Sequence, residues 1–394
     1  MSTPTVRSSH VADHVQKIPR SGIRDFFDIV QSMSDVISLG VGEPDFVTPW
    51  HIREAAIYAL ERGKTGYTSN FGTPSLRKQI AAYVAAKHGV HYDWQGEILV
   101  TVGVSEALDI ALRAIINPGD EVLYHEPCYV SYNPSIVLAH GKAVPITTRQ
   151  SDNFTLRADD VRRAITPRTR AIMLNFPCNP TGAVLPRDEQ EAIAQLCIEH
   201  DLLVLTDEIY GELSYDSELP SIVSLPGMKE RTLYFNGFSK AYAMTGFRIG
   251  YVCAPPTLTE AMLRVHQYAM LCAPIVSQEA AAEALKNGTP AMLHMRDEYR
   301  RRRNFLVHHF NKIGLTCHQP QGAFYLFPNI GVTGMTSREF AVKLLEEKKV
   351  AAVPGTAFGP SGEGYVRCCY ATSMEQLEIA VERIAEFVKD NRQP

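Results

Sequence analysis

A single lysine in the middle of the chain has the surroundings of a reactive amine. Lys240 lies in the segment 236–248 (NGFSKAYAMTGFR), between two apolar runs, 232–235 and 247–253, that are typical of strands. Small uncharged neighbours remove solvation from an ammonium group, which lowers its pKa and makes a neutral, nucleophilic amine available. A surface lysine whose stem covers apolar residues fits this stretch equally well. The choice therefore depends on the other polar groups of the chain.

Two more charged residues lie at or inside expected strands. Asp207 follows the apolar run 202–206, and an acid at the mouth of a buried strand is costly unless it meets a cation. Helix capping by Asp207 is the alternative. Arg367 lies inside the run 365–370, where its planar fork is suited to bind a carboxylate. An arginine on an exposed edge strand would have no such role.

Neutral donors occupy two further loops. Ser105 begins a helix expected over 105–116, and the unpaired N–H groups of a helix start form a site for a phosphate. Ser105 as an ordinary helix cap is the alternative. In 175–182 (NFPCNPTG), two prolines and a glycine fix the backbone and aim the amide of Asn179, with a candidate cis bond before Pro180.

An aromatic ring completes the set. Tyr129 follows an expected strand at 121–124, and its ring could stack on a planar ligand or belong to the core. Pyridoxal phosphate needs a lysine for its aldehyde, an acid for its ring nitrogen, donors for its phenolic oxygen and a cup for its phosphate. The groups found above match these needs.

A metal site is not indicated, because the helix-spaced His10 and His14 lack a third ligand.

Composition indicates a soluble globular protein of two domains. The chain has 394 residues, of which 45% are hydrophobic and 21% charged. Its net charge is −4 and it contains no basic block, so nucleic acid and anionic membranes are not expected partners. Its eight cysteines form no CxxC pair, which is typical of a reduced, cytoplasmic protein. The N-terminal residues have no apolar core, so we expect no signal peptide.

From residue 98 onward, apolar strands alternate with helices. This order predicts an α/β fold with a mostly parallel sheet covered on both faces, which binds ligands beyond the carboxyl ends of its strands. The strands are expected over 98–102, 121–124, 171–174, 202–206, 232–235 and 248–253, and the helices over 105–116, 129–139 and 189–200.

The two ends of the chain have different patterns. Before the sheet, helices are expected over 22–33, 50–62 and 74–88 and a strand over 36–39. After it, a smaller α+β part is expected, with helices over 290–313, 337–347 and 375–389 and strands over 323–327, 350–353 and 365–370. In the long helix, we expect Arg300 to Arg303 to form a solvated face. In the last helix, Leu377, Ala380, Ile384 and Phe387 share one apolar face.

A hydrolase is the main competing interpretation. The run 103–107 (GVSEA) nearly matches the nucleophile elbow of α/β-hydrolases, with Ser105 as nucleophile. That enzyme needs a late histidine. The last histidine, His318, has no suitable loop around it, so this interpretation is disfavoured.

The chain resembles the class I/II aminotransferases, fold type I pyridoxal phosphate enzymes of the aspartate/aromatic aminotransferase superfamily. The resemblance begins at 37–45 (ISLGVGEPD) and extends nearly to the C-terminus, and the motifs NFPCNPTG, TDEIY, FSKAYAMTGFRIGY and GYVRCCYA occur in that order. It implies that the first forty-odd residues fold back onto the C-terminal part. We therefore expect a large cofactor-binding domain of residues 48–289 and a small domain of residues 1–47 and 290–394.

The resemblance also implies site residues. Lys240 would bond to the cofactor aldehyde and then, as a base, move the substrate's α-proton, while Asp207 would keep the pyridine nitrogen protonated. The other implied cofactor contacts are two donors to the phenolic oxygen (Asn179 and Tyr210), a stacking ring (Tyr129) and a phosphate site made of Val104, Ser105, Glu106, Ser239 and Arg248.

The same resemblance implies a homodimer with shared active sites, in which Tyr67 reaches a phosphate in the other subunit. Arg367 would bind the substrate's α-carboxylate, and Gly40 would contact the substrate through its backbone. Gly237 departs from the family, since many relatives have a phosphate-binding serine there. No arginine for a second carboxylate occurs in 268–277. Arg24 or Lys17 in the N-terminal segment could serve instead.

The expected reaction is transamination between an L-amino acid, with aromatic or broad specificity preferred, and a 2-oxo acid such as 2-oxoglutarate. Aspartate or alanine aminotransferase activity is the alternative, and a pyridoxal-phosphate-dependent C–S β-lyase would use the same lysine. A non-enzymatic regulator of this fold would need a fused DNA-binding segment, for which neither terminus has room.

Overall fold

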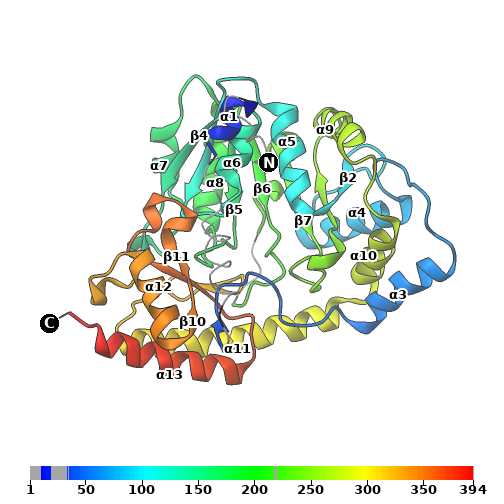
Figure 1. The fold of residues 1–394 in the computed structure, drawn as a ribbon. Helices are drawn as coiled ribbons and strands as arrows, with labels where there is room; N and C mark the ends of the chain where they lie inside the picture. The colour runs from blue at the N-terminus through cyan, green and yellow to red at the C-terminus, as the bar shows by residue number, and fades with distance from the viewer. Residues whose placement is uncertain (1–9, 19–32, 34, 217–219, 394) are drawn as a thin grey trace, which may run out of the picture.

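The computed structural model describes residues 10–18, 33, 35–216 and 220–393. Its main sheet has seven strands in the order β2-β8-β7-β6-β5-β3-β4 (Figure 1). Strand β8 runs antiparallel to both neighbours, while the remaining pairs are parallel. The predicted mostly parallel sheet is therefore confirmed. The strands are β2 (Ile98–Thr101), β3 (Glu121–Glu126), β4 (Lys142–Thr147), β5 (Thr169–Asn175), β6 (Leu203–Asp207), β7 (Thr232–Gly237) and β8 (Gly250–Cys253).

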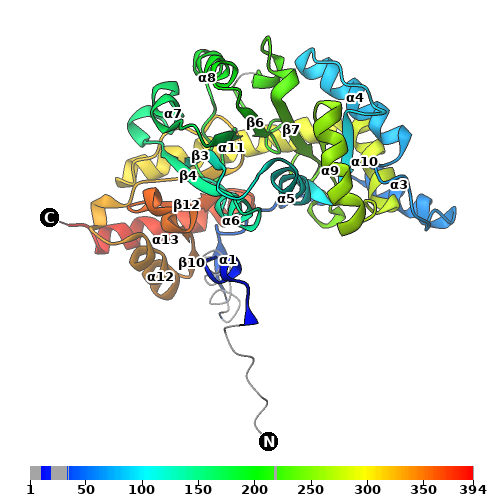
Figure 2. The same ribbon diagram turned by 90° about the horizontal axis from the view of Figure 1, so that it is seen from above.

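Both faces of this sheet are buried, as continuous apolar strands require. Successive side chains of a strand point to opposite faces, and the two apolar clusters follow this rule. Leu123 and Val204 belong to the cluster that includes α8 (Arg187–Glu199), whereas Tyr124 and Leu205 belong to the cluster that includes α5 (Gly103–Ile115). Figure 2 shows α7 (Ala158–Ala164) and α8 on one side of the sheet and α5 and α6 (Tyr132–Leu138) on the other.

Some elements of this half were not predicted. The helices α3 (Trp50–Glu61) and α4 (Pro74–His88) agree with the sequence pattern, but α7, α9 (Pro256–Ala269), α10 (Ile275–Asn287) and the strand β4 were missed. Strand β4 lies at the edge of the sheet, and Ile146 alone among its six residues is buried. An edge strand needs no continuous apolar run, so its sequence carries no strong signal.

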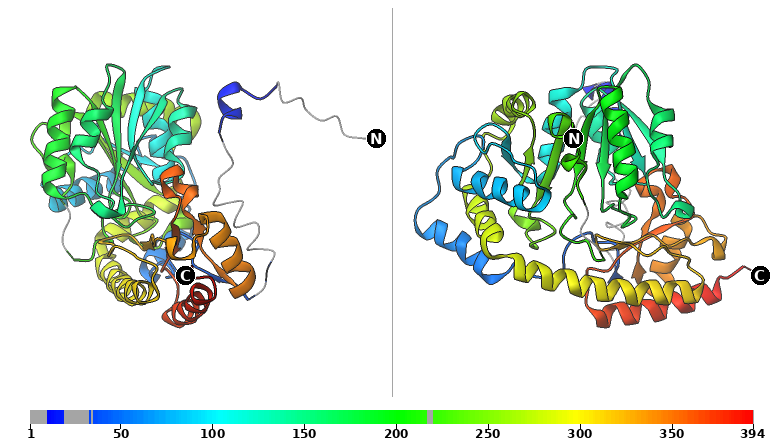
Figure 3. Two further views of the ribbon diagram at one scale, coloured as in Figure 1. Left: turned by 90° about the vertical axis from the view of Figure 1, so that its left-hand side faces the viewer. Right: turned by 180° about the vertical axis from the view of Figure 1, so that it is seen from behind.

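The C-terminal part consists of long helices and short strands. The 25-residue helix α11 (Thr289–Ile313) runs along the base of the molecule, with α13 (Met374–Asp390) against it and α12 (Ser337–Lys348) nearby (Figures 1 and 3). The predicted apolar face of α13 is confirmed, because Leu377, Ala380, Ile384 and Phe387 are buried. Strand β12 (Val366–Cys369) lies between β11 (Val353–Pro354) and β9 (Tyr325–Leu326) in an antiparallel sheet.

One N-terminal strand joins this part of the molecule. Strand β1 (Ile37–Ser38) pairs in parallel with β10 (Val350–Ala351), which means that the single strand predicted over 350–353 is divided between two sheets. The helix predicted over 22–33 lies outside the described residues, apart from its last position. A short helix, α1 (Asp13–Gln16), precedes it.

The prediction that Arg300 to Arg303 form a solvated face is wrong for two of the four residues. Arg302 and Arg303 are buried. Arg302 Nη1 lies 2.9 Å from both carboxylate oxygens of Asp45, and Arg303 Nη1 lies 2.6 Å from Asp216 Oδ2. Both acids come from other parts of the chain, and a buried arginine is stabilised only by such partners. Arg302 thereby anchors the segment that follows β1 to α11.

Other general features limit the kinds of site present. Within the described ranges, no helix combines the length and the apolar character that crossing a bilayer requires. The same residues contain no group of three or more His, Cys, Asp or Glu side chains placed to hold a metal ion. All eight cysteines are free thiols, and seven of them are buried.

Candidate active site

The carboxyl ends of β5 and β6 bring two polar residues side by side. Asn175 and Asp207 are paired across these strands, and Asn175 Nδ2 donates to the backbone oxygen of Asp207 at 2.9 Å. The backbone N–H of Asn179 donates to Asn175 Oδ1 at 3.1 Å. The bond between Asn179 and Pro180 is cis, as predicted. Asn175 thus fixes the loop that carries Asn179 to the strand end that carries Asp207.

The carboxylate of Asp207 is buried and is held by two donors. The hydroxyl of Tyr132, on α6, donates to Oδ2 at 2.8 Å, and the backbone N–H of Ile209 donates to Oδ1 at 3.2 Å. Burial raises the pKa of Asp207 to about 6, against the opposing effect of these hydrogen bonds. Tyr132 was not singled out from the sequence, where it is indistinguishable from a core tyrosine. The rings of Tyr132 and Tyr129 pack edge to face, with their centroids 5.7 Å apart.

The amine of Lys240 has the environment that its sequence neighbours indicate. Burial lowers the pKa of Lys240 to about 8. Its Nζ donates to the backbone oxygen of Gly42 at 2.7 Å and lies 5.9 Å from the ring centre of Tyr210 and 5.7 Å from that of Phe324. The alternative of an ordinary surface lysine does not fit these contacts.

Arg367 lies on β12, the central strand of its sheet, so the alternative of an exposed edge strand is wrong. Its Nη1 donates to Asn179 Oδ1 at 3.0 Å and its Nη2 to the backbone oxygen of Gly40 at 2.6 Å. The rings of Tyr325 and Phe358 lie 4.6 and 4.8 Å from the guanidinium carbon. The Nε atom is buried without a hydrogen-bond partner in the described structure, which leaves a donor for a ligand.

The start of α5 is the place where the sequence predicts a cup for a phosphate. Its N-cap residue, Val102, provides no side-chain cap, and Ser105 is exposed in the first turn. Gly103 has φ +75°, and a Cβ atom there would lie 2.7 Å from Nη2 of Arg248. The guanidinium of Arg248 therefore lies directly against the helix start, where unpaired N–H groups and the helix dipole favour an anion.

The carboxylate of Glu106, in the first turn of α5, is directed away from the predicted phosphate site. Glu106 Oε2 accepts from the backbone N–H of Val102 at 2.5 Å, and its Oε1 lies 2.5 Å from Nδ1 of His266, a fully buried residue of α9. These partners hold the carboxylate where it does not compete with an anion at the N–H groups. His266 was missed because it lies in a helix that the sequence pattern did not predict.

The remaining predicted residues lie in different surroundings. Tyr210 is buried and its hydroxyl lies 2.8 Å from that of Tyr325, while Ser239 is buried beside Lys240. Tyr67 is 87% exposed, in the loop between α3 and α4. Lys17 is exposed at the end of α1, and Arg24 lies outside the described residues.

The structure explains why a side chain is missing at Gly237, the position that departs from the family. Gly237 ends β7 opposite Gly250 of β8. A Cβ atom on Gly237 would lie 3.1 Å from the Gly250 Cα and 3.2 Å from the backbone oxygen of Ile249. A serine here would therefore require the two strands to move apart by a few tenths of an ångström.

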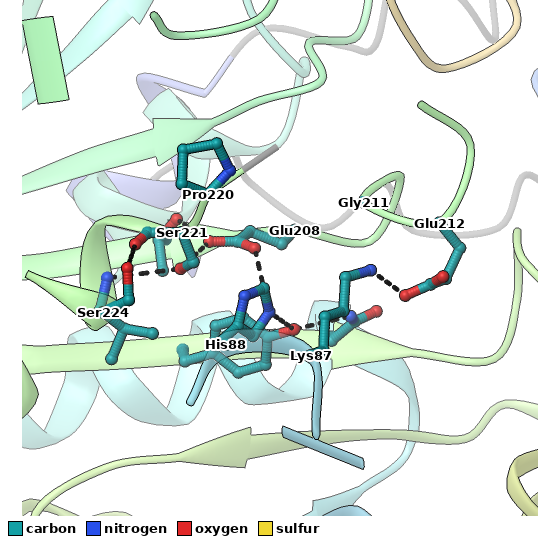
Figure 4. A network of polar contacts seen from close by, with 12 residues as sticks. Lys87, His88, Glu208, Gly211, Glu212, Pro220, Ser221 and Ser224 are labelled. Carbon is teal, nitrogen blue, oxygen red and sulfur yellow. Dashed lines mark hydrogen bonds and ion pairs between the residues drawn. The ribbon is translucent and has the colours of Figure 1, made fainter. Parts of the chain in front are cut away.

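The carboxylate next to Asp207, that of Glu208, belongs to a separate network of polar contacts (Figure 4). Glu208 accepts hydrogen bonds from Ser221 Oγ at 2.5 Å and Thr206 Oγ1 at 3.1 Å, and it lies 3.8 Å from Nε2 of His88 at the end of α4. Burial raises the pKa of Glu208 to about 7. Its partners Ser221, Thr206 and His88 are not predicted site residues, so we regard this network as structural support for the strand end.

Comparisons with known proteins agree with this geometry. The sequence profile of the family "Aminotransferase class I and II" matches residues 34–384. YugH of Bacillus subtilis is 53% identical over 381 residues, which cover 97% of this chain and 99% of that protein. An aspartate aminotransferase of Pyrococcus abyssi is 45% identical over 385 residues, again covering 97% and 99%.

A solved structure is similar over most of its length. The crystal structure of an aromatic aminotransferase from Pyrococcus horikoshii OT3 superimposes with a TM-score of 0.89 and 46% identity, covering 93% of this chain and 99% of that one. This family is known to use pyridoxal phosphate. The hydrolase interpretation of Ser105 is therefore wrong, and the chain belongs to the class I and II aminotransferase family.

Proposed function

We propose that this protein binds pyridoxal phosphate at Lys240 and catalyses transamination between an L-amino acid and a 2-oxo acid. The observation that carries the proposal is a short loop that holds two functional groups at once. The Gly42 carbonyl accepts from Lys240 Nζ at 2.7 Å, and the Gly40 carbonyl accepts from Arg367 Nη2 at 2.6 Å. An amino acid carries its amino group and its carboxylate on one carbon, so it suits an amine and a carboxylate receptor that share one loop.

The donors and acceptors of the site fit the cofactor. Asp207 is a buried carboxylate with a raised pKa, and a protonated ring nitrogen would supply the cation it lacks. Asn179 and Tyr210 would donate to the phenolic oxygen, and Tyr129 would lie against the ring. The phosphate would be bound by the backbone N–H groups of Val104, Ser105 and Glu106, the Ser239 hydroxyl and the Arg248 guanidinium.

Bound pyridoxal phosphate supplies an aldehyde that accepts the amino group and a ring that accepts electrons. Residues of the protein then transfer protons and bind the substrate. Lys240, with its lowered pKa, is suited to remove and return the proton at the substrate's α-carbon near neutral pH. Arg367 binds the α-carboxylate with Asn179 beside it, and Gly40 contacts the substrate through its backbone. Together they place the α-proton near Lys240.

The substrate proposal is an aromatic or broad-range amino acid with 2-oxoglutarate as the acceptor. Aromatic rings gather at the site, since Tyr129, Tyr210, Phe324 and Tyr325 all lie close to the groups described above. For substrates with a second carboxylate, such as aspartate, Arg24 or Lys17 is the proposed receptor. The relatives include aspartate and aromatic aminotransferases, which supports both choices.

A half-reaction screen tests the proposed function. The loaded protein is mixed in turn with single L-amino acids, without an oxo acid, and the absorbance of the bound cofactor is followed. We expect phenylalanine, tyrosine and aspartate to change the spectrum, and added 2-oxoglutarate to restore it. Pyruvate, ammonia and a thiol released from cystathionine would instead show a C–S β-lyase. A spectrum that no amino acid changes would overturn the proposal.

We also propose a homodimer with shared active sites. Large apolar and aromatic side chains are exposed in two stretches, which include Val47, Trp50 and Tyr67 in the first and Tyr268 and Met270 in the second. Gln278 ties the second region to the first, because its Nε2 donates to Thr68 Oγ1 at 3.1 Å. Exposed groups of this kind mark protein interfaces, and Tyr67 would reach the phosphate bound by the partner.

Sedimentation equilibrium tests the dimer, and a cofactor titration tests Tyr67. The expected mass is twice the 43.8 kDa of the chain. Tyr67→Phe is expected to stay dimeric but to bind pyridoxal phosphate about tenfold more weakly, since one hydrogen bond to a charged group is lost. A monomer at micromolar concentration with full cofactor affinity would contradict both statements.

We also propose a division into two domains and a cytoplasmic location. One apolar cluster joins Ile37 and Leu39 to residues 295–388 and also includes Tyr210, Leu213, Tyr215 and Ala243, while the other large clusters lie within 52–292. This distribution supports a domain of residues 48–289 and another of residues 1–47 and 290–394. Eight free cysteines support a cytoplasmic location.

A further inference from the structure

A buried tyrosine outside the predicted site contacts three of its parts. Tyr325 lies on β9 and is 1% exposed. Its hydroxyl is 2.8 Å from that of Tyr210, and its ring is 4.6 Å from the guanidinium carbon of Arg367. A Cβ atom on Gly42 would lie 2.5 Å from the Tyr325 hydroxyl oxygen, so this hydroxyl also lies against the residue whose carbonyl accepts from Lys240.

We propose that Tyr325 is a positioning residue that links the donor to the cofactor's phenolic oxygen, Tyr210, with the receptor of the substrate's carboxylate, Arg367. This inference rests on the proposed function and deepens it. It assigns separate tasks to the two ends of one side chain. The hydroxyl orients the proton of Tyr210, and the ring holds the plane of Arg367.

The hydroxyl task follows from counting protons. Each tyrosine has one proton, and only one of the two can lie between their oxygens. If Tyr325 donates, the proton of Tyr210 remains available for a ligand oxygen, and the bond that Tyr210 accepts strengthens it as a donor. If Tyr210 donates, its proton is used inside the pair. The direction of this bond therefore decides whether Tyr210 can serve the cofactor.

The surroundings favour Tyr325 as the donor. Burial raises the pKa of both hydroxyls, and the positive charge of Arg367 opposes this rise. The charge of Arg367, whose guanidinium carbon lies 4.6 Å from the Tyr325 ring, is the largest influence on the pKa of Tyr325 after burial, whereas for Tyr210 it ranks behind the effects of Tyr325. The Tyr325 hydroxyl is therefore the more acidic of the two and the better donor. The other titratable groups that face the pair are Tyr129, Cys369 and Lys240.

The ring task follows from the packing of Arg367. Its guanidinium lies between the rings of Tyr325 and Phe358, at 4.6 and 4.8 Å. Aromatic faces attract a guanidinium electrostatically and restrict its orientation without using its N–H donors. Those donors then remain directed toward Asn179, Gly40 and a ligand. Phenylalanine at position 325 would preserve this contact, whereas leucine would remove it.

Three variants of the loaded enzyme separate the two tasks. Tyr325→Phe removes the hydroxyl, Tyr325→Leu removes hydroxyl and ring, and Tyr370→Phe is the matched control. Tyr370 is equally buried, and its hydroxyl bonds to Tyr215 at 3.2 Å and to the Ala323 carbonyl at 3.3 Å. Two quantities are measured for each variant: the pH midpoint of the bound cofactor's absorbance, and the Kd of 3-phenylpropionate, a carboxylate without an amino group. The Kd is measured both with and without the cofactor.

We expect Tyr325→Phe to raise the pH midpoint by about half a unit to one unit, because a weaker donor stabilises the anionic phenolic oxygen less. Its Kd for 3-phenylpropionate stays within about twofold of the original. Tyr325→Leu shows the same rise and also weakens 3-phenylpropionate about tenfold, with or without cofactor. Tyr370→Phe changes neither quantity.

Two outcomes would overturn the assignment: a midpoint unchanged in Tyr325→Phe, or equal shifts in Tyr325→Phe and Tyr370→Phe. Failure of the proposed function is recognised separately. In that case the unmodified protein itself shows no cofactor absorbance that responds to amino acids, and the comparison among the variants does not arise.

Discussion

Lys240→Ala is expected to lower transamination turnover by about 10⁴-fold, the upper end of what a positioned acid–base group contributes. The variant loses the amine that bonds to the cofactor and also the base that moves the α-proton. No other lysine in the described ranges shares the position of Lys240 above the Gly42 carbonyl. Single-turnover absorbance measurements with phenylalanine give the rate directly. Lys348→Ala, which removes a half-buried lysine paired with Glu386, is the control and keeps full activity.

A second substitution at this position, Lys240→Met, tests the cause of the low pKa. In the cofactor-free protein, the folded-state pKa of Lys240 is about 8, below the ordinary value of 10.5. The favourable contribution of the neutral amine is therefore complete above pH 10.5 and is lost as the pH falls through about 8. Lys240→Met, which keeps the apolar stem, is expected to remove this slope from the free energy of unfolding.

Urea titrations of the cofactor-free protein at several pH values between 7 and 11 measure that slope. A variant with an unchanged slope would mean that Lys240 is not desolvated. Retention of wild-type turnover by Lys240→Ala would remove the basis of the proposed function. The two results are independent, so a desolvated lysine without a catalytic role can be recognised.

The predicted site residues that the structure places close to one another share one property. Lys240, Asp207 and Asn179 each lie just beyond an apolar run, where a polar side chain stands out against its neighbours. Arg367 stands out inside a strand for the same reason. A charged or amide group at such a place is costly without a partner, so its presence alone indicates that a partner exists.

The residues that were missed have the opposite property. Tyr132 and Tyr325 are aromatic residues in apolar surroundings, which is the ordinary composition of a core. Their roles depend on partners 75 and 115 residues away, Asp207 and Tyr210. The error at Arg302 has the same origin, because its partner Asp45 is 257 residues away. Such pairs are created by the topology of the chain and leave no local pattern in the sequence.

The strands and helices were likewise predicted only where the local sequence carries a strong pattern. The buried strands β5, β6 and β7 were predicted because both of their faces are apolar, and each lies within two residues of its predicted bounds. Strand β4, at the edge of the sheet, has one buried residue and gave no signal. Helices α9 and α10 were also missed, and with them His266, the partner of Glu106 at the phosphate cup.

Asp207→Asn is expected to lower turnover by about 10²–10³-fold, the range found when one preorganised electrostatic group is removed. The asparagine can keep the local structure, because its oxygen still accepts from the Ile209 N–H and its amide can donate to the Tyr132 hydroxyl. What it loses is the negative charge. A neutral partner no longer favours a protonated ring nitrogen, so the ring accepts electrons less readily while cofactor and substrate still bind.

The adjacent residue provides the matched control for this prediction. Glu208→Gln also neutralises a buried carboxylate with a raised pKa, one position along the same strand end, but in a separate network with Ser221 and His88 (Figure 4). If charge at the ring nitrogen is what matters, Asp207→Asn lowers kcat and Glu208→Gln leaves it within about twofold, although both relieve the same desolvation. Equal losses of kcat in the two variants would mean that the strand end needs both charges for its structure. The role of Asp207 in catalysis would then lose its support.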